Sequence, residues 1–542
     1  MAELTGGEIL ARALVHQRVE HLFYVMGGPM VHAANACEAL GIGMVDARHE
    51  QASAMMANAY ARVRRRVGVC MACSGPGTLN LVTGIAHAHV DGAPVVALGG
   101  SSALSERGLG AFQECDQLAA MRPFTRWAER CHEARRIPEL VDAAFRHAFG
   151  ATPGPVYLDL PGDVLYQRVP EEQLEWPEPA ARARPLGDPG QVERAIGLLA
   201  AAERPIVLTG SGILWSEADA DLLALVERFG IPFWTTPQGR GVIPEDHPLC
   251  FLAARNTAFR EADLVLLVGT RLNYMIGFGR APRFNAAARW IQVDLDPLEI
   301  GRTRPVDAGI VGDARGVLRQ LVAASAGRVA PSRYAAWVAR LAELNRGKER
   351  EAEAAMATGQ TPIHPLRLCR EVRDFMDRDA VLVVDGNDIL NFARQAIPFS
   401  VPLSLNSGPF GTMGVGPPFG IGAKVALPGR QVIVLQGDGA FGMNGMELDT
   451  AVRHGLNVIW VISNNAGWTA VRKDYRAGQH LGARPYHAMA AGLGCHAELV
   501  EDPEQIRPAL ERAAKSGRPA VLNVIVDPAI GGKTTRFATY AT

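Results

Sequence analysis

Ten short apolar runs recur along the whole chain, and each is bounded by Gly, Pro or Asp. They lie at residues 67–73, 93–100, 155–161, 204–210, 263–269, 290–296, 380–386, 431–437, 457–463 and 520–526. Runs of this length suit strands that are covered on both faces of a sheet, and helical patterns separate most of them along the chain. This alternation predicts an α/β fold built from doubly wound parallel sheets.

Two polar seams divide this pattern into three parts. A chain of 542 residues is too long for one hydrophobic core. The first seam, at about 171–191, is rich in Pro, Glu and Arg. The second seam, at about 325–362, contains a charged helix of Ala, Glu and Arg. We therefore expect three α/β domains, at 1–170, 190–330 and 360–542.

The composition excludes several classes of protein. The residues are 48% hydrophobic and 20% charged, the net charge is −1, and no basic block suggests a nucleic-acid partner. No apolar stretch approaches the roughly 18 residues that cross a bilayer, and the start, MAELTGGEILARAL, is typical of a helix. We expect a cytoplasmic protein. Cys70 and Cys73 form a C-x-x-C without a second pair, which favours buried thiols in a strand over a zinc site.

One βαβ unit suggests a phosphate and metal site. Gly437-Asp438-Gly439 ends one apolar run, and Asn464-Asn465 ends the next, after a helical segment. Because the crossover is right-handed and the strands are parallel, Asp438 and Asn465 should meet at their carboxyl ends. Carboxylate and amide oxygens suit Mg²⁺, and small residues let backbone N–H groups approach an anion. The unit predicts a diphosphate bridged by Mg²⁺.

This unit resembles the diphosphate motif of thiamine-diphosphate (ThDP) enzymes, in which GDG and NN stand at this spacing. The resemblance implies that Asp438, Asn465 and the Gly467 carbonyl bind Mg²⁺. It also implies a wider set of cofactor-binding residues, namely Asn387, Gly437, Gly439, Ala440 and Trp468.

Two further positions match the needs of a thiamine cofactor. Glu50 begins a predicted helix of small residues, EQASAMMANAYARV, whose close packing should desolvate it. By the resemblance, Glu50 protonates the aminopyrimidine ring, which lets the cofactor form its C2 ylide. The glycine-rich stretch SGPFGTMGVG indicates a close backbone approach. By the resemblance, Met413 wedges under the cofactor and the Gly411 carbonyl accepts its amino group.

The stretch GAFQECDQ, at 110–117, bears on the substrate. Gln113 is a neutral group that could hydrogen-bond a substrate carbonyl. Pyruvate decarboxylases carry a His-His pair where this chain has Phe112-Gln113, so that activity is disfavoured. His87 and His89 are better explained as helix histidines with satisfied partners.

The nearest resemblance is to the 2-hydroxyacyl-CoA lyase and oxalyl-CoA decarboxylase branch. It rests on RHEQASA, SGPGTLN, GGSSALSERGLGAFQECDQ and GTRLNYMIGFGRAPRFN with WIQVDLDPLEIGR. In that branch the middle domain binds an ADP moiety. Arg271 could pair with a phosphate there, and Asp294 could hold a ribose hydroxyl. Lys533 and Arg536, in the basic tail, could close over a CoA phosphate.

The resemblance implies a reversible lyase that splits a 2-hydroxyacyl-CoA into formyl-CoA and an aldehyde or ketone. The decarboxylase branch has Tyr-Glu in place of Phe112-Gln113, which favours the lyase side. Acetolactate synthases share Phe-Gln-Glu, and NNAGW departs from the lyase pattern. A decarboxylase or carboligase of acetolactate-synthase or benzaldehyde-lyase type, acting on a 2-oxo acid, therefore stays open. So do oxalyl-CoA decarboxylase and a non-catalytic relative. The family shares active sites between chains, so we expect a homodimer or homotetramer.

Overall fold

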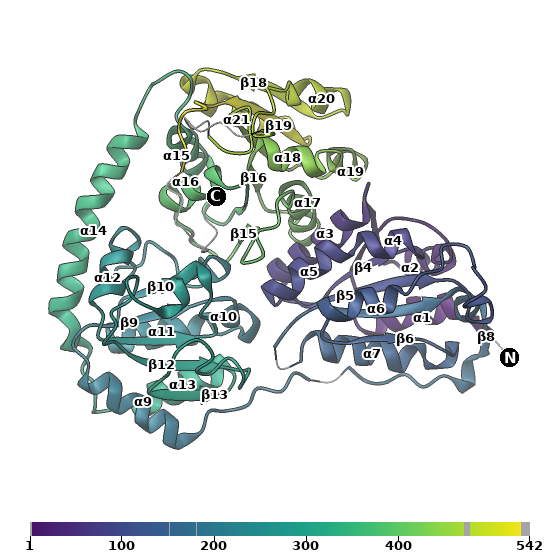
Figure 1. The fold of residues 1–542 in the computed structure, drawn as a ribbon, viewed down its shortest axis with the longest axis horizontal. Helices are drawn as coiled ribbons and strands as arrows, with labels where there is room; N and C mark the ends of the chain where they lie inside the picture. The colour runs from purple at the N-terminus through teal and green to yellow at the C-terminus, as the bar shows by residue number, and fades with distance from the viewer. Residues whose placement is uncertain (1–2, 151, 180, 471–476, 533–542) are drawn as a thin grey trace.

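The computed structural model describes the chain except residues 1–2, 151, 180, 471–476 and 533–542. Three parallel β-sheets, each with helices on its faces, form three bodies (Figure 1). The predicted doubly wound α/β fold is therefore confirmed. Each of the ten apolar runs contains a strand. Within the described residues, no helix is long and apolar enough to span a membrane.

The N-terminal sheet has six strands in the order β3-β2-β4-β5-β7-β6. Its strands are β2 (His21–Tyr24), β3 (Gly43–Asp46), β4 (Gly68–Ala72), β5 (Val95–Ser101), β6 (Ala128–Arg130) and β7 (Val156–Pro161). Its helices are α1 (Gly6–His16), α2 (Val31–Ala39), α3 (Glu50–Arg64), α4 (Pro76–Asn80), α5 (Val82–Asp91), α6 (Gln117–Met121), α7 (Ile137–Ala148) and α8 (Gly162–Tyr166). A small antiparallel pair joins β1 (Glu3–Thr5) to β8 (Arg168–Pro170).

The middle sheet has five strands in the order β10-β9-β11-β12-β13. Its strands are β9 (Pro205–Thr209), β10 (Phe233–Thr235), β11 (Leu264–Val268), β12 (Arg289–Asp294) and β13 (Ala308–Val311). Its helices are α9 (Pro189–Ala201), α10 (Ser211–Ser216), α11 (Asp219–Phe229), α12 (Arg255–Glu261) and α13 (Ala314–Ala324).

The C-terminal sheet has six strands in the order β15-β14-β16-β17-β19-β18. Its strands are β14 (Val381–Asp385), β15 (Ser404–Asn406), β16 (Val432–Gly437), β17 (Ile459–Asn464), β18 (His496–Val500) and β19 (Ala520–Ile525). Its helices are α15 (Pro365–Phe375), α16 (Asp388–Ala396), α17 (Gly416–Ala426), α18 (Asp438–Asn444), α19 (Glu447–Arg453), α20 (Tyr486–Gly492) and α21 (Ile506–Lys515).

Three local predictions need correction. The N-terminal helix begins only at Gly6, because Glu3–Thr5 pairs with β8 and Thr5 then caps the helix together with Glu8. The crossover between GDG and NN is two short helices, α18 and α19, rather than one. Cys73 lies just beyond β4 and is half-buried, whereas Cys70 is buried within that strand.

The N-terminal and C-terminal bodies pack through α3 and α17. Most of the α3 side chains and all of the α17 residues are buried. A Cβ on Gly422 would lie 2.3 Å from the Met56 carbonyl oxygen, so glycine lets the two helices approach closely. The prediction that the small residues of α3 mean close packing is confirmed.

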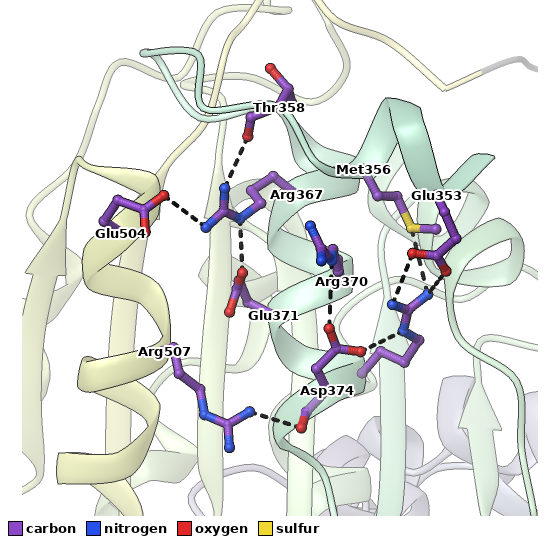
Figure 2. Close-up of polar contacts among 10 residues, drawn as sticks. Glu353, Met356, Thr358, Arg367, Arg370, Glu371, Asp374, Glu504 and Arg507 are labelled. Atoms are coloured by element: carbon purple, nitrogen blue, oxygen red, sulfur yellow. Dashed lines mark hydrogen bonds and ion pairs between the residues drawn. The ribbon is translucent and has the colours of Figure 1, made fainter. Parts of the chain in front are cut away.

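The charged helix predicted in the second seam is α14 (Ala335–Met356), which runs from the middle body to the C-terminal body (Figure 1). Figure 2 shows how its end is anchored. Arg373 on α15 pairs with Glu353 on α14, and Arg367 joins Glu371 to Glu504 near α21 at 2.8 and 3.0 Å. These contacts fasten the end of α14 to α15, and α15 to the segment before α21.

Candidate active site

Asp438 is the centre of the first half of the site. It is the first residue of α18, directly after β16, and is 1% exposed. Neither of its carboxylate oxygens has a hydrogen-bond partner in the described part of the chain. Burial raises the pKa of Asp438 to about 7, and nearby backbone N–H groups, that of Gly439 first, offset this only in part because none is placed to form a full hydrogen bond. A buried carboxylate left unpaired in this way fits a cation as its partner.

Asn465 follows the neighbouring strand, since Gly437 in β16 pairs with Ser463 in β17. The side-chain oxygen of Asn465 accepts the Gly467 N–H at 3.3 Å, which folds the loop back beside Asp438. One carboxylate, one amide and one carbonyl form an all-oxygen donor set of the kind that Mg²⁺ takes. Among the described residues, no cluster of three or more His, Cys, Asp or Glu side chains offers another metal site.

Trp468 and Gly439 are in direct contact. A Cβ on Gly439 would lie 2.6 Å from Cε3 of the Trp468 ring, so only glycine fits under the indole. Ala440 is buried in α18, while Trp468 is 40% exposed. The structure therefore brings the predicted residues of GDGA and NNAGW into one cluster, with a small-residue surface beside the Asp438 carboxylate.

The loop at 407–415 carries Gly411 and Met413, and it is held from two sides. On one side, Asn444 at the end of α18 donates to the Gly414 carbonyl at 2.7 Å. The buried Asp385 carboxylate also accepts the Gly416 N–H at 2.8 Å. Gly411 has a positive φ of 71° and is exposed, and Met413 is half-buried. Asn387 lies close in sequence, as the exposed residue that precedes α16.

On the other side, the same loop rests on a buried ionic junction of all three bodies. Asp91 at the end of α5 accepts Nε2 of His87 at 3.1 Å and Nε2 of Gln238 at 3.0 Å. It also pairs with Arg62 of α3 at 3.5 Å. A Cβ on Gly408 would lie 2.0 Å from the Asp91 carboxylate. His87 is thus a helix histidine with a carboxylate partner, as the sequence suggested. The same expectation is wrong for His89, whose Nδ1 is buried without a hydrogen-bond partner among the described residues.

Glu50 is the centre of the second half of the site. It is the first residue of α3, and His49 caps that helix by accepting the Gln51 N–H. Glu50 is 9% exposed, and its Oε2 accepts Nδ2 of Asn80 at 2.9 Å. Asn80 was not predicted as a site residue, although it ends the quoted SGPGTLN stretch. The predicted desolvation of Glu50 is confirmed.

Gln113 lies near Glu50, across the turn that leaves β4. A Cβ on Gly75 would lie 2.5 Å from the Gln113 carbonyl oxygen, and one on Gly77 would lie 3.2 Å from Oε1 of Glu50. The Ser74 hydroxyl donates to Oε1 of Gln113 at 2.6 Å. The amide nitrogen of Gln113 is thereby oriented as the free donor. Phe112 is 84% exposed.

Among the described residues, no hydrogen bond or ion pair joins Glu50, Asn80 or Gln113 to the Asp438, Asn465 or Trp468 side chains. The elements that carry the two halves are nevertheless in contact, since Asn444 of α18 lies 3.9 Å from the Met55 sulfur of α3. The Arg48 N–H donates to Glu447 of α19 at 3.0 Å, and Arg453 of α19 pairs with Asp46 of β3. Each chain thus presents two partial sites, one at the end of the first sheet and one at the end of the third.

A cavity of about 100 Å³ lies at the carboxyl ends of the middle strands. It is lined by both predicted nucleotide residues, Arg271 and Asp294, and by Gly212 and Gly269. Nη2 of Arg271 donates to the Val90 carbonyl at 2.7 Å. Burial raises the pKa of Asp294 to about 6. The cavity reaches Asp91 and Pro409, so it abuts the back of the 407–415 loop. Lys533 and Arg536 lie outside the described residues.

Comparisons with known proteins agree with this arrangement. Three family models match, described as the N-terminal TPP binding domain, the central domain and the C-terminal TPP binding domain of thiamine pyrophosphate enzymes. They cover residues 4–120, 192–321 and 390–524. TPP, thiamine pyrophosphate, is another name for ThDP.

Similar proteins extend over nearly the whole chain. An acetolactate synthase large subunit of Mycobacterium tuberculosis is 37% identical, covering 97% of this chain and 96% of its own. A 2-hydroxyacyl-CoA lyase of Arabidopsis thaliana is 32% identical over 98% and 97%. A probable acetolactate synthase large subunit of Methanocaldococcus jannaschii is 34% identical over 97% and 92%. The chain therefore belongs to the family of thiamine pyrophosphate enzymes.

Proposed function

We propose that this enzyme uses Mg²⁺ and ThDP to cleave a 2-hydroxyacyl-CoA into formyl-CoA and an aldehyde or ketone, or to run the reverse condensation. The observation that carries the cofactor part is the buried Asp438 carboxylate with two unpaired oxygens beside the NNAGW loop. The substrate part is supported by the Phe112-Gln113 stretch and by relatives named 2-hydroxyacyl-CoA lyase.

Asp438, Asn465 and the Gly467 carbonyl would hold Mg²⁺ and, through it, the diphosphate. Gly437, Gly439, Ala440 and Trp468 would surround that diphosphate, with Asn387 at the neighbouring strand end. When bound, the cofactor supplies a nucleophilic carbon and an electron sink for a bond made or broken beside a carbonyl.

The remaining residues place protons and the substrate. Glu50 would exchange a proton with the pyrimidine ring from a desolvated position, while Asn80 fixes its carboxylate. Gln113 would donate from its amide nitrogen to a substrate carbonyl, because Ser74 already occupies its amide oxygen. Met413 and the Gly411 carbonyl would support the cofactor from a loop that is packed on both sides.

We also propose that the active form is at least a homodimer, in which the Glu50 half of one chain faces the Asp438 half of another. In the described part of one chain, Glu50 bonds to Asn80 and not to any residue of the Asp438 cluster, which supports this arrangement. A homotetramer would repeat the same pairing.

The middle cavity is proposed as a nucleotide site. Its position at the carboxyl ends of parallel strands is where open α/β sheets bind such ligands. Arg271 would contact a phosphate, and Asp294 a ribose hydroxyl. ADP or the ADP part of CoA is the proposed occupant.

The deciding assay supplies Mg²⁺, ThDP and a short 2-hydroxyacyl-CoA, and follows formyl-CoA and the matching carbonyl compound by mass spectrometry. We expect both products from the wild-type enzyme and neither from Glu50→Gln. Glu50→Gln should still bind ThDP with Mg²⁺, because the diphosphate half is untouched. Products that persist at the wild-type rate in that variant would remove Glu50 from the proposed role.

Acetolactate synthase is the second candidate, and the 37% identity to proteins of that name favours it. The same preparation should be given pyruvate. Acetolactate formation without any cleavage of 2-hydroxyacyl-CoA would replace the lyase proposal with a 2-oxo-acid carboligase.

A further inference from the structure

A network of buried polar side chains surrounds Asp159 in β7 of the N-terminal body. The Asp159 carboxylate accepts the Ser101 hydroxyl of β5 at 3.2 Å and forms an ion pair with Arg130 of β6. It also accepts the Tyr157 hydroxyl at 2.9 Å. Asp159 is 0% exposed, and both of its carboxylate oxygens have partners inside the protein.

Gln117, the first residue of α6, completes this network and is 1% exposed. Its amide nitrogen lies 2.7 Å from each of three acceptors, which are the Gly100 carbonyl, the Tyr157 hydroxyl and Oδ1 of Asp159. Its amide oxygen accepts the Gly75 N–H at 3.0 Å. A flipped amide would turn its oxygen toward the Asp159 carboxylate, so the network fixes the amide oxygen on Gly75.

Gly75 lies between Gln117 and Gln113. It has a φ of 58°, and a Cβ there would lie 2.5 Å from the Gln113 carbonyl oxygen. Gln113 also has a φ of 58°, a left-handed conformation that is uncommon for residues other than glycine. Backbone of this kind persists where surrounding contacts hold it, and it clusters at functional sites. The contact with Gly75 is one of those that hold Gln113.

The loop that precedes Gln113 is held by Glu114. The Glu114 carboxylate accepts three backbone N–H groups within this loop, at 2.5, 3.1 and 3.1 Å, from Gly108, Gly110 and Ala111. The Ser74 hydroxyl, in the turn after β4, donates to Oε1 of Gln113 at 2.6 Å. The loop at 108–114 is therefore a closed unit that meets the turn after β4 through Gln113.

The turn after β4 also leads toward Glu50, but Glu50 has support of its own. Asn80, five residues beyond Gly75 at the end of α4, donates to Oε2 of Glu50 at 2.9 Å. Gly75, in contrast, packs directly against Gln113. A shift of Gly75 should therefore move Gln113 more than Glu50.

We propose that Gln117 is a positioning residue for the substrate, which sets the place of Gln113 through the Gly75 N–H. This inference rests on the proposed function, since it needs Gln113 to contact the substrate carbonyl. Gln117 is itself buried and so acts through Gln113. A displaced Gln113 would weaken its hydrogen bond to the substrate and leave the Asp438 half of the site intact.

Steady-state kinetics of Gln117→Asn test the assignment. Asparagine keeps a side-chain amide but is one carbon shorter, so it cannot bond to Gly75 and Asp159 together. We expect KM to rise about tenfold, the value of about one hydrogen bond, with kcat near wild type. Gln117→Leu, which removes the amide, should raise KM further. Gln117→Asn carries the test should Gln117→Leu fail to fold.

Ser101→Ala is the matched control. It removes one hydrogen bond from the same buried network, but that bond goes to Asp159 and not to Gly75. KM should stay at the wild-type value in this variant. An equal rise in KM for Ser101→Ala and Gln117→Asn would overturn the proposal, because the effect would then follow from a loosened network. ThDP affinity, measured by calorimetry with Mg²⁺, should be unchanged in both variants, and a tenfold loss in Gln117→Asn would also overturn the proposal.

A double-variant cycle tests whether Gln117 acts through Gln113. Gln113→Ala alone should raise KM, and adding Gln117→Asn should raise it little further, because both changes remove the same contact with the substrate. Additive increases would overturn the proposal, since Gln117 would then act by another route.

The choice of substrate separates this inference from the proposed function. The enzyme could react with pyruvate and leave 2-hydroxyacyl-CoA intact, which would overturn the lyase reaction. The same KM comparisons with pyruvate would then support or overturn the assignment of Gln117. Cleavage of 2-hydroxyacyl-CoA with a wild-type KM in Gln117→Asn would leave the function standing and overturn this inference.

Discussion

Asp438 is held in a state that is unfavourable for a carboxylate without a cation. It is 1% exposed and both oxygens lack partners within the described chain. The fold provides no cationic side chain to balance the Asp438 charge among the described residues. Other buried carboxylates, such as Asp91 and Asp159, each form an ion pair with an arginine. An unpaired buried charge of this kind costs stability and is expected where a ligand completes the site.

We predict that Asp438→Asn weakens ThDP binding without lowering the stability of the cofactor-free protein. ThDP affinity in the presence of Mg²⁺ should fall by about a hundredfold or more, since a charged metal ligand is lost. The cofactor-free protein should be as stable as wild type or more stable, because a buried unpaired charge disappears. Calorimetric titration and urea unfolding measure the two effects. Asp449→Asn, at a half-exposed ion pair on α19, is the control, and equal ThDP affinity in both variants would contradict the assignment.

Asn80 is predicted to position Glu50. Asn80→Ala removes the 2.9 Å hydrogen bond to Oε2 of Glu50, and hydrogen bonds to charged groups contribute about 1.5–3 kcal/mol. We expect turnover to fall by about tenfold or more with little change in ThDP affinity. Ser74→Ala is the comparison, since it releases Gln113 instead and should raise KM for the substrate. Steady-state kinetics measure both, and identical profiles for the two variants would argue against separate roles.

Glu447 gives a pH dependence whose sign follows from its burial. Desolvation raises its pKa from 4.5 to about 7 in the folded protein. Its protonated form is therefore favoured by folding, so its contribution is present at low pH and is lost as pH rises through about 7. We predict that Glu447→Gln reduces the fall in unfolding free energy between about pH 4.5 and 7.

The size of the Glu447 effect is a few kcal/mol at most, at about 1.4 kcal/mol per pKa unit. Urea unfolding at several pH values measures it. Glu498→Gln is the control of opposite sign, because the Arg512 hydrogen bond lowers the pKa of Glu498. An unchanged pH slope in Glu447→Gln would mean that Glu447 is solvated in the folded protein.

At the scale of helices, strands and loops, the 407–415 loop depends on contacts that come from other bodies. Gly408 has a φ of 56°, and the Asp91 and Gln238 side chains lie where a Cβ would be. We predict that Gly408→Ala displaces this loop and lowers ThDP affinity about tenfold. Gly455→Ala is the matched control, since Gly455 has a φ of 61° and nothing within 4 Å of its Cβ position. ThDP titration should therefore show no loss for Gly455→Ala, and equal losses would assign the effect to backbone strain alone.

Ten of the eleven interior strands of the three parallel sheets could be predicted, because each is a continuous apolar run. The short interior strand β2 (His21–Tyr24) and the edge strands could not. β18 (His496–Val500) is largely half-exposed, and β6 (Ala128–Arg130) has three residues, so neither leaves a clear apolar signal. The site residues also divide into those that the sequence could predict and those that it could not. The spacing of GDG and NN predicts two neighbouring strand ends, but Asn80 and Gln238 reach their partners only through tertiary packing.

At the scale of the molecule, the two halves of the site lie on two bodies that share a tight interface. α3 and α17 pack so closely that only a glycine, Gly422, fits beside the Met56 carbonyl between them. That interface fixes Glu50 and Asp438 relative to each other within one chain, but no hydrogen bond joins the two side chains in the described structure. The middle body contributes a cavity and Gln238 to the junction behind the cofactor loop. In the proposed homodimer, a second chain would complete each half.

We predict that two inactive variants restore activity when mixed. Glu50→Gln and Asp438→Asn would each inactivate a homodimer. If sites are shared, a heterodimer has one site with both changes and one intact site, so random exchange should recover about a quarter of wild-type activity. Native mass spectrometry should confirm that heterodimers form, and each variant exchanged with itself is the control. Heterodimers without activity would place Glu50 and Asp438 of the same chain in one site, because only then does every site keep one defect.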